Sequence, residues 1–314
     1  MDNKRDLILS LLNTTQAPAY TPAAFFLHFG EAYHRGQAAV DKHLQYFRET
    51  DMDFVKIQYE LPFPRLPNIQ RPADWADMPR YKEDFFEPQL AVIDGIVKAV
   101  KAEAMIVCTL YSPFMCAGHA VGAERMLQHI AEDPEAVRRG MEIVAESVLN
   151  FVKAGIRLGL DGFYTSTQGG ERSRLADTVL FDRLVRPFDL MVMDEANAHC
   201  SFNILHICDY VDTYADISHF VNYPGQVVNT PLMVGGKPLD MAEAARLFER
   251  PVMGGLDRHG VLAQGTPDQV RAAARSVLDV APPRFILAAD CTAPADTSWD
   301  NLRAAIETAH QRQP

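Results

Sequence analysis

Short apolar segments alternate with amphipathic segments along nearly the whole chain. Each apolar segment is three to seven residues long and bounded by polar or turn residues, which is the pattern of a buried strand. The segments between them have the length and periodicity of helices. We expect strands at 24–29, 54–59, 104–110, 162–165, 203–207, 227–229, 252–255 and 285–288. We expect helices at 38–50, 86–102, 124–130, 134–158, 181–199, 211–219, 241–248, 267–280 and 299–311.

This alternation in a chain of 314 residues predicts an α/β protein built as a (β/α)8 TIM barrel, with residues 1–314 forming a single domain. The competing architecture is an open doubly wound sheet, in which a glycine-rich nucleotide turn usually follows the first strand. Here the first strand runs into Gly30-Glu31-Ala32-Tyr33, with no GxGxxG, and no Walker loop occurs anywhere in the sequence. The barrel is therefore the favoured architecture.

A proline-rich segment at 61–84 is the longest stretch without a helix or strand pattern. It is too long for an ordinary connection in a compact domain, and such loops usually close over or contribute to a binding site. It also contains Arg65, Arg71 and Arg80. We therefore expect this loop to have a functional role.

The charge balance and the cysteine pattern restrict the partners and the compartment. The net charge of −11 argues against nucleic acid or an anionic membrane as the main partner. No apolar run reaches the roughly 18–20 residues that span a bilayer, and the first residues lack the apolar core of a signal peptide. Five scattered cysteines do not form a disulfide framework. We expect a cytoplasmic protein.

Soft metal ligands stand at the ends of two expected strands. His206 and Cys208 are two residues apart, so a strand places them on the same face. Cys291 follows the last expected strand, and in a barrel the carboxyl ends of all strands meet at one mouth. One imidazole and two thiolates are suitable ligands for Zn²⁺, with a fourth position left for water or substrate. The alternative is that these residues are buried for packing alone.

Other polar residues end the expected strands and would share the same rim. They are His28, Tyr59, Glu60, Tyr111, Tyr164, Asn229, Asp257 and Asp290.

Three runs in the second half resemble the uroporphyrinogen decarboxylase superfamily: 204–209 (ILHICD), 254–267 (GGLDRHGVLAQGTP) and 285–292 (FILAADCT). Porphyrinogen decarboxylases of this superfamily carry an arginine-rich stretch near the N-terminus that binds propionate groups. Here the corresponding run, 26–35 (FLHFGEAYHR), has Arg35 as its one arginine, and Glu60 stands where the family has a catalytic aspartate. A multiply carboxylated macrocycle needs fixed cationic groups. The resemblance therefore argues against that substrate.

The chain is more similar to the zinc-dependent corrinoid methyltransferases of the methylcobamide:coenzyme M type. Their pattern, a His-x-Cys after the fifth strand and a Cys after the eighth, is matched here by His206, Cys208 and Cys291. The cobalamin-independent methionine synthases use similar zinc chemistry and add a glutamate ligand. The corresponding region here, 227–231 (VVNTP), has no carboxylate. The fourth ligand stays open, with Asp290, Glu60, Asn229, Tyr59 and water as candidates.

This resemblance implies a methyltransferase that moves a methyl group from a methylated corrinoid, or a similar donor, to a zinc-activated thiol. The implied partners are a small-molecule thiol acceptor and a corrinoid protein that docks at the barrel mouth. Candidate catalytic residues are Glu60, His28 and Tyr111, and candidate cofactor-binding residues are Asn229 and Asp257. Two alternatives remain: a metal-free decarboxylase of a porphyrinogen or a smaller carboxylate, with the loop arginines as a clamp, and a non-catalytic barrel that binds a tetrapyrrole or a metal.

Overall fold

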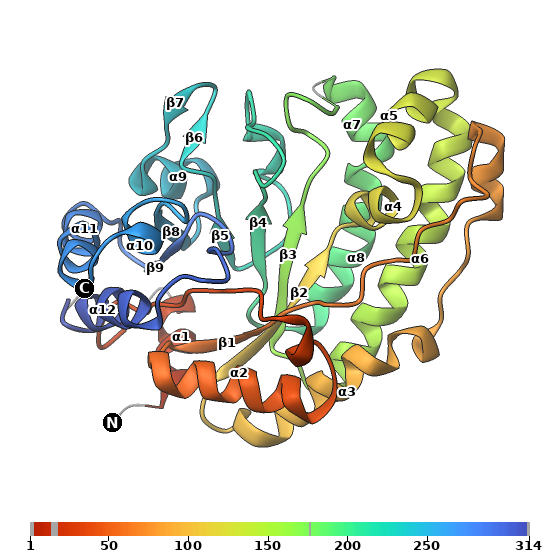
Figure 1. Ribbon diagram of the computed structural model, residues 1–314. Coiled ribbons are helices and arrows are strands. Elements are labelled where there is room, and N and C mark those ends of the chain that lie inside the picture. Colours follow the sequence, from red (N-terminus) through yellow and green to blue (C-terminus); the bar gives the residue numbers. More distant parts are fainter. Residues whose placement is uncertain (1–2, 14–17, 176, 313–314) are drawn as a thin grey trace.

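The computed structural model describes residues 3–13, 18–175 and 177–312. Its centre is a curled parallel sheet with the strand order β1-β2-β3-β4-β5-β8-β9, and helices cover its outer side (Figure 1). The strands are β1 (Phe54–Ile57), β2 (Met105–Tyr111), β3 (Gly162–Thr167), β4 (Ile204–Ile207), β5 (Val227–Asn229), β8 (Val252–Leu256) and β9 (Phe285–Ala289). Because the sheet is buried on both faces, its strands are almost continuously apolar.

Helices connect successive parallel strands, as the alternating pattern predicts, except between β4 and β5. The start of α6 is fixed by the side chain of Asp133, and α11 begins with a capping box between Thr266 and Gln269. No helix in the described ranges is long and apolar enough to cross a membrane. The helices are α1 (Lys4–Leu12), α2 (Gly36–Thr50), α3 (Glu83–Val100), α4 (Pro113–Val121), α5 (Ala123–Glu132), α6 (Pro134–Leu158), α7 (Thr178–Leu184), α8 (Arg186–His199), α9 (Met241–Phe248), α10 (Val261–Gln264), α11 (Pro267–Asp279) and α12 (Trp299–His310), with single 3-10 turns at Glu31–Tyr33, Pro72–Asp77 and Ser218–Phe220.

The strand expected at 24–29 is not a regular strand. Two isolated bridges, Ala23 to Leu287 and Leu27 to Ala293, place this segment beside β9. On its other side, the Tyr46 hydroxyl donates to the carbonyl of Phe25, and the Gln58 side chain donates to that of Leu27. Side chains thus take carbonyls that a neighbouring strand would use, so the ladder does not extend to β1.

Two of the helix predictions are corrected. The helix expected at 181–199 is split into α7 and α8, because Pro187 has no amide hydrogen to continue the helix across the junction. The helix expected at 211–219 is absent apart from the turn Ser218–Phe220. There the carboxylates of Asp212 and Asp216 accept from backbone amides, which competes with helix formation.

The long segment at 61–84 is anchored to the helices. Trp75 is fully buried, and its indole donates to His129 on α5 at 2.9 Å. Gly140 on α6 leaves room for this ring, since a Cβ there would lie 2.5 Å from it. The segment therefore packs against α5 and α6 as part of the structure.

The register of the strands determines which residues meet at the carboxyl edge of the sheet. Ser166 on β3 pairs with His206 on β4, which pairs with Asn229 on β5. In Figure 1 this edge lies at the top, where α4, α7 and the hairpin of β6 (Met233–Val234) and β7 (Lys237–Pro238) gather. The strand ends, α4 and the loops that follow β3, β4, β8 and β9 line the candidate site.

Candidate metal centre

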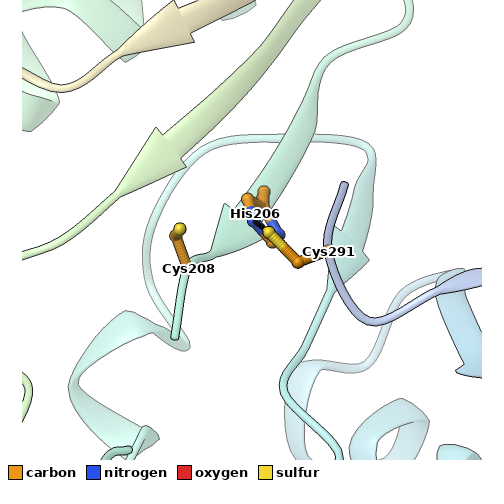
Figure 2. Close-up of side chains that lie close together, drawn as sticks. All are labelled: His206, Cys208 and Cys291. Atoms are coloured by element: carbon orange, nitrogen blue, oxygen red, sulfur yellow. Dashed lines mark hydrogen bonds between the residues drawn. The ribbon is translucent and has the colours of Figure 1, made fainter. Parts of the chain in front are cut away.

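Three potential metal ligands converge at the carboxyl edge of the sheet. His206, Cys208 and Cys291 each offer one ligand atom, and these atoms lie within 4.8 Å of one another (Figure 2). All three side chains are buried, with 1%, 3% and 6% of their surface exposed. We refer to these three residues as the ligand cluster. It is the group that the sequence pattern singled out.

The backbone around the ligand cluster is held by hydrogen bonds to β3 and to the loop that follows. The amide of Cys208 donates to the carbonyl of Thr167 at 3.1 Å, and the Thr167 hydroxyl donates to the carbonyl of His206 at 3.1 Å. The Tyr214 hydroxyl donates to the carbonyl of Cys208 at 3.0 Å. These bonds fix the chain direction just past the end of β4, where Cys208 turns back toward the site.

The imidazole of His206 is oriented by stacking. Its ring lies 4.7 Å from that of Tyr164 with an interplanar angle of 28°, and its Nε2 lies 3.3 Å from Cys291 Sγ. Its Nδ1 is buried and has no hydrogen-bond partner in the described part of the chain. The Tyr164 hydroxyl in turn donates to Asn229 Oδ1 at 2.6 Å. Asn229 therefore acts on the imidazole through Tyr164.

The two thiols titrate as a pair. The hydrogen bond from the Cys291 thiol lowers the pKa of Cys208 well below its usual value; burial opposes this effect and His206 adds to it. The same interaction raises the pKa of Cys291, and burial raises it further. Gln168 Nε2 also donates to Cys208 Sγ at 3.4 Å.

This donor set fits a tetrahedral zinc ion. Zn–S bonds of about 2.3 Å and Zn–N bonds of about 2.0 Å place neighbouring ligand atoms roughly 3.5–3.8 Å apart. The separations in the ligand cluster are compatible with that spacing after small side-chain shifts. Two thiolates and one imidazole would hold the ion and leave one position open to the adjoining cavity.

A cavity of about 650 Å³ adjoins the ligand cluster. Its volume is in the range that holds a small ligand. No Asp or Glu is among the described residues that line it, although the chain has a net charge of −11. The side chains that carry positive charge or can acquire it on this lining are Lys56, Arg174, His28, His119, His206 and His259.

Lys56 on β1 is a buried cation within this cavity wall. Its Nζ donates to Gln58 Oε1 at 3.0 Å and to Thr109 Oγ1 at 3.1 Å. It also lies 4.6 Å from the ring centres of Phe26 and Tyr164. Burial lowers the pKa of Lys56 to about 8, against the raising effect of nearby thiols and Glu60.

Two of the candidate catalytic residues, His28 and Tyr111, form another part of the cavity wall. His28 Nδ1 and Glu60 Oε1 are 2.8 Å apart, and His28 lines the cavity with 44% of its side chain exposed. Tyr111 also lines the cavity and packs edge-on against His119 at 5.5 Å. Burial raises the pKa of Tyr111, so its hydroxyl stays protonated. Glu60 reaches the cavity through His28.

The two candidate cofactor-binding residues, Asn229 and Asp257, are not among the described residues that line the cavity. Asn229 is fully buried and its amide donates to the carbonyls of Met253 and Ala289, so its side chain ties β5 to β8 and β9. Asp257 is exposed and accepts from the amide of His259 at 2.8 Å, which shapes the turn after β8.

The other fourth-ligand candidates are engaged elsewhere. Asp290 accepts from both the backbone and the side chain of Arg258. Tyr59 is buried against Tyr111 and Phe151 on the outer side of the sheet. Neither side chain lines the cavity.

Sequence reasoning missed four residues of this site: Lys56, Gln168, Arg174 and Arg258. For Lys56 the sequence did contain a signal, since this lysine stands inside the otherwise apolar strand Phe54–Ile57. A lysine is almost never fully buried unless its charge is paired. Gln168 directly follows β3 and Arg258 follows β8 by two residues, but nothing in their local pattern distinguishes them from rim residues. Their contacts depend on how the loops are arranged in space, and no sequence pattern shows that arrangement.

Similar solved structures share this fold. A methyltransferase from Methanosarcina mazei aligns over 98% of this chain and 98% of its own, with a TM-score of 0.78 and 14% identity. A B12-independent methionine synthase from Shewanella sp. W3-18-1, in complex with selenomethionine, aligns over 93% of this chain and 96% of its own, with a TM-score of 0.56 and 13% identity. An endo-1,4-beta-mannanase from Rhizomucor miehei aligns over 93% and 94%, with a TM-score of 0.53 and 8% identity. At these identities the likeness concerns the fold alone.

Comparison of sequences gives a match to one protein family. No curated protein matches the chain. The family model described as uroporphyrinogen decarboxylase (URO-D) matches residues 50–312, a range that contains every strand of the sheet and the whole ligand cluster. The superfamily resemblance read from the sequence is thereby confirmed. The chain belongs to the uroporphyrinogen decarboxylase (URO-D) family.

Proposed function

We propose that this protein is a zinc-dependent methyltransferase that transfers a methyl group to a thiol acceptor. The observation that carries the proposal is the ligand cluster, in which one imidazole and two thiols converge beside a cavity. A site with three protein ligands and one open position is typical of catalytic zinc. The proposed fold is a closed (β/α)8 barrel formed by residues 1–314 as one domain, with the segment at 24–29 completing the wall beside β9.

A bound zinc ion would lower the pKa of an acceptor thiol, so that a thiolate is available at neutral pH. The chain's own residues bind and orient that acceptor. The acceptor sulfur faces the ligand cluster, and the Lys56 ammonium offsets the negative charge of the thiolates. Lys56 and Arg174 lie on a lining without carboxylates and favour an acceptor that carries an anionic group, although Arg174 also pairs with the buried Glu171 at 3.7 Å.

The methyl donor in this proposal is a methylated corrinoid carried by a partner protein that docks at the mouth of the cavity. The acceptor thiolate would attack the methyl carbon in line, forming a new S–C bond while the bond between the methyl group and its carrier breaks and its electron pair stays with the carrier. His28, positioned by Glu60, and Tyr111 line the same cavity and orient the acceptor. The proton released from the thiol leaves to solvent.

A second candidate function is a metal-free decarboxylase, and the family match and the cationic lining favour it. Its carboxylate clamp was expected from the arginines of the long loop. In the described residues, however, Arg71 pairs with Asp74, Arg80 pairs with Glu146, and Arg65 lines a separate surface cleft. The clamp would then have to be Arg174 and Lys56, which leaves the ligand cluster without a role.

The deciding experiment measures zinc content and methyl transfer on the same preparations. Wild type is expected to hold about one zinc per chain and to methylate an anionic thiol from free methylcobalamin. The double variant Cys208→Ser/Cys291→Ser is expected to lose both properties. The matched control is Cys116→Ser/Cys200→Ser, which alters two buried cysteines outside the ligand cluster. Zinc-free wild type after growth with added zinc would refute the proposal and leave the decarboxylase.

A further inference from the structure

Arg258 is a buried arginine that contacts both loops of the ligand cluster. It follows β8 by two residues, and 10% of its side chain is exposed. Its Nη1 donates to Asp209 Oδ1 at 2.8 Å and also forms an ion pair with Asp290 Oδ2. Its backbone amide donates to Asp290 Oδ1 at 2.8 Å. One residue therefore joins three segments of the chain.

The two aspartates are the sequence neighbours of the two cysteines. Asp209 directly follows Cys208, and Asp290 directly precedes Cys291. The strands that lead to them, β4 and β9, are not adjacent, because β5 and β8 lie between them. Backbone pairing therefore does not join the two loops directly. The Arg258 side chain makes this link across the intervening strands.

The spacing of the two thiolates controls how tightly a metal is held. A cysteine loop that relaxes moves its sulfur away from the tetrahedral position. Groups that orient metal ligands typically change metal affinity by about 10- to 100-fold when they are removed. A guanidinium that contacts two carboxylates in a nearly water-free setting is a rigid link, because its donors have a fixed planar geometry.

We propose that Arg258 is a positioning residue that clamps the Cys208 and Cys291 loops at the separation that zinc requires. This inference rests on the proposed function, since it assigns Arg258 to the assembly of the same metal centre. Arg258 does not touch the metal; it acts through Asp209 and Asp290. Arg258, Asp209 and Asp290 are not among the described residues that line the cavity.

The chain offers a matched control at the other end of the same strand. Arg250 precedes β8, is largely buried, and donates to the carbonyls of Val221, Tyr223 and Gly225. It contacts neither cysteine loop. Replacing either arginine removes a buried cation and its hydrogen bonds, but only Arg258 is linked to the ligand cluster.

The test compares Arg258→Met, Arg258→Lys and Arg250→Met with wild type. Zinc affinity is measured by competition with a chromogenic chelator, the geometry of the site by the visible spectrum of Co²⁺-substituted protein, and stability by thermal melting. Arg258→Met is expected to bind zinc at least tenfold more weakly, with a changed Co²⁺ spectrum. Arg258→Lys keeps the charge and is expected to recover part of the affinity. Arg250→Met is expected to melt at a lower temperature with unchanged zinc affinity and spectrum.

The possible results separate the clamp from the function. If wild type binds zinc and Arg258→Met binds it equally well with the same Co²⁺ spectrum, the clamp is refuted and the methyltransferase proposal stands. If wild type binds no zinc, both are refuted. Where Arg258→Met does not fold, Asp209→Asn takes its place, because it weakens the same link at a partly exposed carboxylate. Unchanged zinc affinity in that variant would also refute the clamp.

Discussion

The two walls of the cavity are built differently. The ligand cluster is almost fully buried and its backbone is tied to the neighbouring strand, whereas the His28–Glu60 pair is joined by one hydrogen bond with His28 nearly half exposed. The first wall is made of residues at or directly after strand ends, and the second includes a segment that joins the sheet through isolated bridges. Metal binding needs fixed distances between ligand atoms, which suits the rigid ligand cluster. Contacts that adapt to a bound molecule suit the wall that holds His28 and Glu60.

The sharpest test of this contrast replaces one residue from each wall. Cys291→Ala is expected to reduce zinc affinity by at least 100-fold and to abolish methyl transfer, because two protein ligands do not hold catalytic zinc tightly. His28→Ala is expected to keep the full zinc content. Both are measured by metal analysis after dialysis and by turnover with free methylcobalamin. If His28→Ala also lost its zinc, the two walls would not be independent.

Lys56 interacts electrostatically with both parts of the wall, because nearby thiols and Glu60 raise its pKa. Its pKa is about 8 in the folded chain, below the ordinary value of 10.5, because burial disfavours the charged form. The unfolded chain therefore binds this proton more tightly, and the free energy of unfolding rises as pH increases from about 8 to 10.5. The penalty is complete below pH 8, and its full size is on the order of 3 kcal/mol.

Lys56→Met isolates this contribution. Relative to wild type, the variant is expected to lack the rise in unfolding free energy between pH 8 and 10.5, since it has no proton to release. Denaturant titrations of zinc-free protein at several pH values measure the difference, and subtraction removes the titration of the cysteines that both proteins share. Parallel pH profiles for the two proteins would mean that the Lys56 ammonium is well solvated.

The same contrast explains which parts the sequence predicted. The ligand cluster was predictable because strand-end position and a two-residue spacing fix where His206, Cys208 and Cys291 point. The sheet order followed from the alternation of strands and helices. Asn229 was assigned to the rim for the same reason, but a side chain at the last position of a short strand can also face a neighbouring strand. The Asn229 side chain does so, and it forms hydrogen bonds with Tyr164 and with the backbone. Contacts between loops, such as those of Arg258, have no periodic signature.

Tyr164 is expected to give a smaller effect inside the buried wall. Tyr164→Phe removes the donor to Asn229 Oδ1 and leaves that buried oxygen with one partner fewer, at a cost of about 1–2 kcal/mol in unfolding free energy. The ring still stacks on His206, so zinc affinity should fall by less than tenfold. The control is Tyr46→Phe, a buried tyrosine whose hydroxyl donates to the carbonyl of Phe25. Tyr46→Phe should lose a similar unfolding free energy with no change in zinc affinity. If zinc affinity fell equally in both variants, Tyr164 would have no specific role in orienting His206.

The exposed wall should respond least to the loss of its ion pair. Glu60→Gln replaces a partner of a half-exposed histidine, and such pairs contribute less than about 1 kcal/mol to stability. Because Glu60 acts on the acceptor through His28, turnover should fall by no more than about tenfold, with zinc content unchanged. Glu49→Gln, which alters a carboxylate that accepts from Gln45 on the exposed face of α2, provides the baseline. A loss of 100-fold or more with intact zinc is the size expected for a general acid or base, and it would move Glu60 from a positioning role to a direct one.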